Sequence, residues 1–243
     1  MSIRGKTVLI TGGADRLGRS IALELASRGA QVAINYRRSS AAAEETRRRA
    51  AGFGVRTICA QADVTDPAAT AVMVHTVEER LGPIDHLVAA AGVFQRTPLD
   101  EVTQDAWDEM MRGNYETFRV PAAILAPAMR HRGGGSIVAF GDVAAVRPWS
   151  DYIPYCVAKS RVLHHARDLA VAFAPEVRIN CVLPGPVLFP PDYPAEARRK
   201  EVDRTLLRRA GQPGDVARAV AFLLEGEYLT GVQLPVDGGR LLV

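Results

Sequence analysis

The sequence has few cysteines, no long apolar run and almost no excess of one charge. Its three cysteines, Cys59, Cys156 and Cys181, form no CxxC pair and no metal-ligand spacing, so we expect neither a disulfide framework nor a bound metal. Reduced thiols are typical of a cytoplasmic protein. No apolar run approaches the roughly 20 residues that cross a bilayer, and the first residues run straight into a predicted strand, which leaves no room for a signal peptide. We therefore expect a cytoplasmic protein with no membrane partner.

The charge balance argues against a second class of partner. There are 30 basic and 27 acidic side chains, a formal excess of +3, and the arginines are scattered along the chain. Proteins that bind nucleic acid concentrate basic residues on one face, so we expect no nucleic acid partner. The composition, 48% hydrophobic and 23% charged, is that of a globular protein with a core. We therefore expect a small-molecule substrate.

Short β-branched apolar runs alternate with longer segments of helical period along the whole chain. Strands that alternate with helices in this way form βαβ units around a parallel sheet. We predict a single α/β domain over residues 1–243, with a Rossmann fold and a doubly wound parallel sheet of about seven strands flanked by helices. The predicted strands are Thr7–Ile10, Gln31–Asn35, Arg56–Ala60, His86–Ala90, Ser136–Phe140, Arg178–Val182 and Gln233–Val236. The clearest helical patterns are Leu17–Arg28, Ala41–Gly52, Pro67–Leu81 and Tyr155–Phe173.

The alternation breaks once, at Pro184–Pro194, where five prolines fall within eleven residues. Proline fixes φ and removes a backbone donor, so neither a helix nor a strand is expected there. Irregular segments of this kind often lie against a ligand. We predict a substrate loop near residues 184–207, in which Val187, Leu188 and Phe189 line an apolar wall.

A glycine-rich turn, Thr11–Arg19, joins the first predicted strand to the first predicted helix. Its glycines, Gly12 and Gly18 among them, permit a tight turn and let the backbone approach a pyrophosphate at the helix N-terminus. Arg16 and Leu17 lie in the same turn. Glycines also serve ordinary turns, but the strand–turn–helix context here is the one that dinucleotide binding requires.

The end of the second strand indicates which dinucleotide binds. NAD-binding folds carry an acidic residue there for the ribose 2′-hydroxyl, whereas arginine accommodates a 2′-phosphate. Here the segment reads Tyr36-Arg37-Arg38-Ser39, with no acid, and Arg16 could join it around the phosphate. We predict NADPH as the cofactor; a solvated loop with incidental charge is the alternative.

Two further segments follow predicted strands and face the same crevice. Asp63-Val64 follows the third strand, where the aspartate accepts from the adenine amino group or, alternatively, caps a helix. Ala91-Gly92 follows the fourth strand, where small side chains let the cofactor lie close or simply allow tight packing. We predict that both segments contact the cofactor.

Tyr155 and Lys159 are spaced i and i+4 in a predicted helix, which puts both side chains on one face. A tyrosine near its reference pKa of about 10 is a poor acid at neutral pH. A neighbouring ammonium stabilises the phenolate, so we expect Lys159 to lower the pKa of Tyr155 and make it a usable proton donor. Taken alone, the spacing also fits an ordinary surface pair.

In combination, these features resemble the short-chain dehydrogenase/reductase superfamily over nearly the whole chain. Several motifs in the correct order are hard to obtain by chance, whereas each alone is a weak signal. From Gly5 to Gly239, the matching motifs are the Thr11–Gly18 turn, Asp63-Val64, Ala91-Gly92, Asn114, Tyr155-x-x-x-Lys159, Pro184-Gly185 and Val236-Asp237-Gly238-Gly239.

The resemblance implies roles for individual residues. Tyr155 would be the catalytic acid, and Lys159 would also hydrogen-bond the nicotinamide ribose. Asn114 would help to hold a water chain that feeds protons to Lys159. On the far side of the crevice, the implied cofactor contacts are Pro184, Gly185 and Val187.

Two departures from the superfamily pattern resemble its pteridine reductase branch. Arg16 stands where many members have glycine, and Asp142 replaces the usual catalytic serine, thirteen residues before the tyrosine. This resemblance implies that Phe94 stacks on the pterin and that Arg16 lies near both substrate and pyrophosphate. The implied substrate contacts are Arg16, Phe94, Asp142, Tyr155 and Leu188.

The chemistry of an aspartate agrees with this second resemblance. An ionised Asp142 cannot donate to a carbonyl oxygen and would repel a developing alkoxide. Reduction of a pterin C=N bond instead needs a proton on a ring nitrogen, which Asp142 and Tyr155 could relay. The alternative is that Asp142 only caps a loop, at an inactive position.

Three functions therefore stay open. The favoured one is an NADPH-dependent reductase of a pterin, and the nearest alternative is a ketone or 3-oxoacyl reductase on the same scaffold. A non-catalytic dinucleotide-binding sensor is favoured by Ala89-Ala90-Ala91-Gly92, where the superfamily has Asn-Asn-Ala-Gly. Homotetramers are usual in the families that the chain resembles, so we expect one by analogy.

Overall fold

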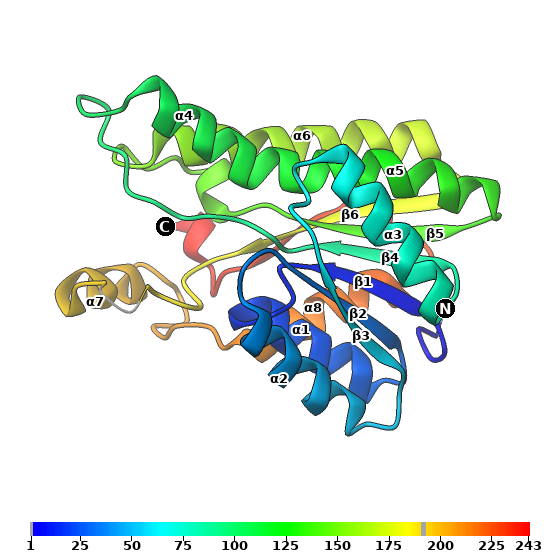
Figure 1. Cartoon of the computed structure of the whole chain (residues 1–243). Coiled ribbons are helices and arrows are strands. Elements are labelled where there is room, and N and C mark those ends of the chain that lie inside the picture. The colour runs from blue at the N-terminus through cyan, green and yellow to red at the C-terminus, as the bar shows by residue number, and fades with distance from the viewer. Residues whose placement is uncertain (1, 191–192) are drawn as a thin grey trace.

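Seven parallel strands form one sheet in the computed structural model, which describes residues 2–190 and 193–243 (Figure 1). The strands are β1 (Thr7–Thr11), β2 (Gln31–Tyr36), β3 (Thr57–Gln61), β4 (Ile84–Ala89), β5 (Gly135–Phe140), β6 (Val177–Pro184) and β7 (Gln233–Val236). They lie in the order β3-β2-β1-β4-β5-β6-β7. The predicted single-domain Rossmann fold is confirmed, and each strand begins and ends within two residues of its predicted position.

Helices cover both faces of this sheet. They are α1 (Arg16–Ser27), α2 (Ser40–Ala51), α3 (Pro67–Leu81), α4 (Gln104–Met111), α5 (Thr117–His131), α6 (Ile153–Phe173), α7 (Ala195–Asp203) and α8 (Pro213–Glu225). Figure 1 shows α1, α2 and α8 against one face and α3, α5 and α6 against the other, with α4 packed beside α6. None of the described helices is long and apolar enough to span a membrane.

The continuous apolar character of the strands follows from this double cover. Successive side chains of a strand point to opposite faces, so in a sheet covered on both sides most of them are apolar. Buried polar exceptions such as Asn35 and Asn180 form hydrogen bonds. In β1, Leu9 packs with Phe118 of α5 in one core. Its neighbours Val8 and Ile10 pack with Ile21 of α1 in the other core.

One expectation for the proline-rich segment is wrong. Pro184 is the last residue of β6 and pairs with Val236 of β7. A proline is tolerated at this point because the pairing of β5 with β6 ends at Val182, so no ladder partner on that side needs its missing N–H. Residues 185–190 carry no helix or strand, as predicted, and residues 191–192 of the predicted loop lie outside the described residues. Helix α7 then occupies the later part of the predicted 184–207 loop.

The strand order reverses between β1 and β4, which are neighbours in the sheet although β2 and β3 separate them in sequence. The crossovers from these two strands leave in opposite directions, so their carboxyl ends open a crevice. Thr11, at the end of β1, lies opposite Ala89 at the end of β4. The glycine-rich turn and the Ala91-Gly92 segment therefore meet across this crevice.

Phe118→Ala should lower the free energy of unfolding by about 3–5 kcal/mol, since the ring is fully buried and its loss leaves a cavity. Phe53→Ala is the matched control, because that ring is 52% exposed in the turn after α2. Urea unfolding followed by far-ultraviolet circular dichroism measures both values. Equal losses in the two variants would contradict the packing described here.

Candidate active site

A cleft of about 1700 Å³ runs along the carboxyl edge of the sheet. It brings together the residues predicted as catalytic, cofactor-binding and substrate-binding, except Tyr36 and Ser39, which are not part of its lining. The predicted residues in the lining are Gly12, Arg16, Leu17, Gly18, Arg37, Arg38, Asp63, Val64, Ala91, Gly92, Phe94, Asn114, Asp142, Tyr155, Lys159, Pro184, Gly185, Val187 and Leu188.

Asp142 and Tyr155 are joined directly at the bottom of this cleft. Asp142 follows β5, and Tyr155 lies in the first turn of α6. The Tyr155 hydroxyl donates to Asp142 Oδ2 over 2.7 Å. The other oxygen, Oδ1, accepts from the backbone N–H of Ala144 over 2.8 Å and caps a short 3₁₀ turn. Asp142 is therefore both a local cap and a partner of the tyrosine.

The surroundings of Tyr155 shift its pKa in the direction opposite to the one expected. Burial raises the pKa of Tyr155 well above its usual value, and the Asp142 carboxylate raises it further by its charge and by accepting the hydroxyl proton. Burial also raises the pKa of Asp142, against the opposing effects of the Ala144 N–H, the Tyr155 hydroxyl and Lys159. The expectation that Lys159 lowers the pKa of Tyr155 is wrong, because burial and the Asp142 carboxylate in contact with the hydroxyl both raise it.

Lys159 is buried, as Tyr155 is. Its Nζ donates to the carbonyl oxygen of Phe140 over 3.0 Å and lies 5.7 Å from the centroid of the Tyr155 ring. Burial lowers the pKa of this ammonium. Lys159 thus sits one turn behind Tyr155 on the same face of α6, as the spacing predicts.

Asn114 faces Lys159 across Gly92. It lies in a π-helical turn, Arg112–Glu116, between α4 and α5, and such turns are frequent at functional sites. Its Oδ1 accepts from the Val93 N–H over 3.2 Å, which fixes the strand end against the helix. A Cβ at Gly92 would lie 3.0 Å from Asn114 Oδ1 and 3.5 Å from Lys159 Nζ, so only glycine leaves both polar groups free to approach the cleft.

The glycine-rich turn needs its glycines for close approach. Gly12 has φ +64°, and a Cβ there would lie 2.8 Å from the Cα of Ala91. A Cβ on Gly18 would lie 2.1 Å from the carbonyl oxygen of Gly12, so the first turn of α1 could not pack on the strand end. Arg16 also has a positive φ, +49°, and its Nη2 donates to the Leu188 carbonyl across the cleft over 3.2 Å.

Asp63 is held by its neighbours at the other end of the cleft. Its Oδ1 accepts from the Thr65 hydroxyl over 2.7 Å, while Oδ2 lies 3.6 Å from Arg37 and 3.5 Å from Arg112. Burial opposes ionisation, but the Thr65 hydrogen bonds and the two arginines keep the pKa of Asp63 below its usual value. The helix-cap alternative for Asp63 is wrong, because Asp66 caps α3.

Two arginines of this end differ in their surroundings. Arg37 is paired with Asp63, whereas the Arg38 guanidinium forms no ion pair or hydrogen bond with any side chain or backbone group in the described parts of the chain. Arg112 was not predicted from the sequence. Its contact joins the end of α4 to the segment after β3, and these are far apart in sequence, so no local pattern could have indicated it.

Aromatic rings frame the mouth of the cleft next to Tyr155. The Phe94 ring stacks on Tyr152, with centroids 4.8 Å apart and planes 10° apart. Its edge faces Tyr155 at 5.1 Å, and Trp149 stands edge-on at 6.3 Å. Phe94 is 42% exposed, so one apolar surface stays open beside the Tyr155–Asp142 pair. Tyr152, which supports Phe94, was not predicted as a site residue.

Comparison with known proteins shows the family of this chain. The short-chain type dehydrogenase/reductase of Picea abies is 31% identical, with 98% of this chain and 93% of that protein covered. Residues 12–240 match the family model of enoyl-(acyl carrier protein) reductase. An L-rhamnose 1-dehydrogenase (NAD(P)(+)) of Sphingomonas sp. (strain SKA58) is 34% identical, with 98% of this chain and 96% of that protein covered.

Two solved structures share the fold at similar identity. FolM alternative dihydrofolate reductase 1 of Brucella canis, complexed with NADP, has a TM-score of 0.90 and 29% identity, covering 100% of this chain and 97% of that chain. The NADPH-dependent 3-quinuclidinone reductase of Rhodotorula rubra has a TM-score of 0.93 and 28% identity, covering 100% and 93%. The similar proteins thus act on chemically different substrates.

Asp142→Asn should lower the pKa of Tyr155, because the amide keeps the shape and the acceptor for Ala144 but removes the charge that opposes the phenolate. Ultraviolet difference titration of phenolate absorbance measures the shift, with Tyr155→Phe subtracted to isolate this tyrosine from the others. Circular dichroism at each pH controls for unfolding. A phenolate signal that appears at the same pH or higher would show that Asp142 does not govern this hydroxyl.

Proposed function

Because the chain belongs to the short-chain dehydrogenase/reductase family, we propose that it is an NADPH-dependent reductase of a pterin or of a similar flat nitrogen-containing ring. The observation that carries this proposal is the 2.7 Å contact between the Tyr155 hydroxyl and Asp142. Membership of the family makes the chain an NAD(P)-dependent oxidoreductase, which argues against the non-catalytic sensor. Beyond family membership, both NADPH as the cofactor and a pterin as the substrate are proposals.

The residues of the cleft fit a nicotinamide dinucleotide. The glycine-rich turn ends at the N-terminus of α1, where backbone N–H groups favour a pyrophosphate. Gly12 and Gly18 leave no side chain between this turn and the strand ends, as the Cβ distances require. The proposed contacts around the pyrophosphate are Gly12, Arg16, Leu17 and Gly18; around the nicotinamide and its ribose they are Ala91, Gly92, Tyr155, Lys159, Pro184, Gly185 and Val187.

The adenosine end supports NADPH over NADH. Arg37 and Arg38 follow β2, and the tip of this segment carries no acidic side chain. The Arg38 guanidinium has no protein partner among the described residues, so its planar set of donors is available for a phosphate. In this proposal Tyr36 and Ser39 flank the arginines, and Asp63-Val64 borders the adenine.

The bound dinucleotide would supply a hydride, and the side chains of the chain would supply the proton. Tyr155 is the proposed donor at the reacting atom, with Asp142 as the group that exchanges the proton with it through their hydrogen bond. The raised pKa of both groups keeps a proton on this pair at neutral pH. Lys159 would bind the ribose, and Asn114, beside it across Gly92, would hold the water that refills the pair.

A flat ring suits the surfaces next to this pair. Phe94 offers an open aromatic face, and Asp142 can accept from amino and ring N–H groups. Arg16 and Leu188 are hydrogen-bonded across the cleft and would contact the substrate ring on the side nearest the dinucleotide. The similarity to the FolM dihydrofolate reductase of Brucella canis agrees with this substrate class. We propose residues 184–207 as the substrate segment of one NAD(P)-binding domain spanning residues 1–243.

A ketone reductase is the second candidate. It is favoured by the similarity to the 3-quinuclidinone reductase and by the intact Tyr155–Lys159 pair. Asp142 argues against it, because a carboxylate beside the tyrosine would repel the alkoxide that forms from a ketone.

For the oligomeric state and the cellular location, we propose a cytoplasmic homotetramer by analogy with related enzymes.

The purified protein should oxidise NADPH when dihydrobiopterin or dihydrofolate is added, and Tyr155→Phe should lower kcat at least a hundredfold through loss of the acid while NADPH still binds. NADPH absorbance follows the reaction, with 3-quinuclidinone as the ketone comparison. Turnover of the ketone alone would reject the pterin reductase and favour the ketone reductase. Undiminished turnover in Tyr155→Phe would remove the proposed acid.

Arg38→Ala and Arg37→Ala should each weaken NADPH binding roughly tenfold or more while NADH binding changes little, because only NADPH carries the 2′-phosphate. Arg49→Ala is the matched control, since it removes an exposed arginine of α2 outside the cleft. Titration calorimetry with both dinucleotides gives the ratio of dissociation constants. Equal losses for NADPH and NADH would remove these arginines from a phosphate site.

A further inference from the structure

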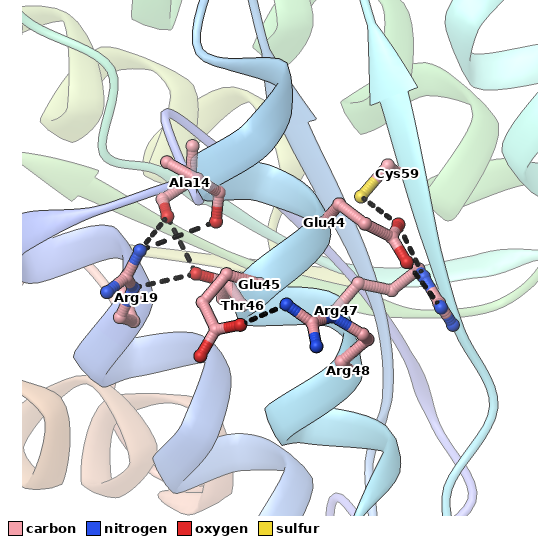
Figure 2. A network of polar contacts seen from close by, with 9 residues as sticks. Ala14, Arg19, Glu44, Glu45, Thr46, Arg47, Arg48 and Cys59 are labelled. Carbon is pink, nitrogen blue, oxygen red and sulfur yellow. Dashed lines mark hydrogen bonds and ion pairs between the residues drawn. The ribbon is translucent and has the colours of Figure 1, made fainter.

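The backbone carbonyl of Ala14, in the glycine-rich turn, is held by two side chains (Figure 2). The Thr46 hydroxyl donates to this oxygen over 2.6 Å, and Arg19 Nη2 donates to it over 3.3 Å. Arg19 Nε also donates to the Thr46 hydroxyl oxygen over 2.8 Å. The three groups form a closed set of hydrogen bonds that joins the turn, α1 and α2; we call it the turn brace.

The position of Thr46 is unusual for a threonine inside a helix. Such a hydroxyl ordinarily bonds the carbonyl four residues earlier in its own helix, which here belongs to Ala42. Thr46 instead donates to Ala14, thirty-two residues away, and Arg19 Nη2 lies 3.4 Å from the Ala42 oxygen. Thr46 is completely buried, so packing alone would be served as well by valine. The Thr46 hydroxyl therefore stabilises the glycine-rich turn rather than α2.

The turn is also held from its opposite side. The Asn35 carbonyl accepts from the Gly13 N–H over 3.0 Å, and its side chain accepts from Gly12 over 3.4 Å. Two residues beyond Ala14, Arg16 keeps a left-handed φ of +49°. With both flanks fixed by protein contacts, the turn has its shape before any ligand arrives, which lowers the entropy lost on binding.

The brace also connects the two ends of the proposed dinucleotide site. Helix α2 begins directly after the Arg37–Ser39 segment, which is proposed for the 2′-phosphate, and the turn is proposed for the pyrophosphate. A hydrogen bond from α2 to the turn therefore fixes the distance between the two phosphate-binding segments. The pyrophosphate and the 2′-phosphate belong to one ligand, so this distance has to match the ligand.

We propose that Thr46 and Arg19 are positioning residues for the dinucleotide, which act through Ala14 and touch no cofactor atom. This inference rests on the dinucleotide part of the proposed function and not on the pterin. It assigns the brace an effect on cofactor affinity and none on the chemical step.

Thr46→Val tests the proposal, because valine keeps the shape and loses the hydroxyl. The dissociation constant for NADPH, followed by its fluorescence, should rise roughly threefold to tenfold, the effect of one lost buried hydrogen bond. The kcat at saturating NADPH should stay near that of the parent protein, and Thr46→Ser should restore the affinity. Arg19→Met should weaken NADPH similarly, and the double variant should lose less than the product of the two effects.

Two controls separate this effect from a general loss of stability. Val77→Ala removes buried volume from α3 in the opposite core and should leave NADPH affinity unchanged at a similar fall in melting temperature. Arg47→Ala removes an exposed ion pair next to Thr46 on α2 and should also change nothing.

Other results would overturn the proposal. If Thr46→Val binds NADPH as tightly as the parent, or if Val77→Ala weakens it equally, the brace has only a structural role. A kcat that falls with unchanged affinity would place its effect on chemistry instead. A parent protein that binds neither NADPH nor NADH overturns the proposed function itself, and this role with it.

Discussion

The arrangement of the molecule depends on the burial of a parallel sheet on both faces. Such a sheet accepts apolar side chains along its strands and concentrates polar groups at the strand ends, where the backbone leaves the layer. The reversal of strand order between β1 and β4 opens those ends into one cleft. Thr11 already begins this change: it is buried at the end of β1, and its hydroxyl accepts from the Ala91 N–H. The site is thus a consequence of where the sheet stops.

Within that cleft, burial determines the charges. Asp142, Tyr155 and Lys159 share one low-dielectric region, so each pKa moves toward the neutral form of its group. Burial therefore favours the protonated form of both the Asp142 carboxyl and the Tyr155 phenol, whereas a serine at position 142 would place no titratable group beside the phenol. A carboxyl in place of a hydroxyl therefore adds a second titratable group to the buried contact with Tyr155.

The fold was largely predictable from the sequence because its signals are local. The alternation of apolar strands with helical patterns gave every strand within two residues, and the i, i+4 spacing put Tyr155 and Lys159 on one face of α6. What could not be predicted depends on contacts between distant segments. The Arg112–Asp63 pair, the Phe94–Tyr152 stack and the Thr46–Ala14 bond each join parts of the chain whose separation is set by the tertiary fold. The prediction of a lowered pKa for Tyr155 is wrong for the same reason, since Asp142, which contacts the hydroxyl, lies outside the helix that carries Tyr155.

The backbone conformation of Arg16 shows why the glycine-rich turn needs support from other parts of the chain. A left-handed φ is easy for glycine and costs other residues roughly 1–2 kcal/mol, so the turn would relax if its flanks were free. The Arg16 guanidinium donates a hydrogen bond across the cleft to the Leu188 carbonyl, and glycine has no side chain that could form this bond. The strain is tolerated because Asn35 holds the turn before Arg16 and Thr46 holds it at Ala14. The braced turn therefore supports an arginine at this position, and the two features together link α2, the glycine-rich turn and the segment after β6.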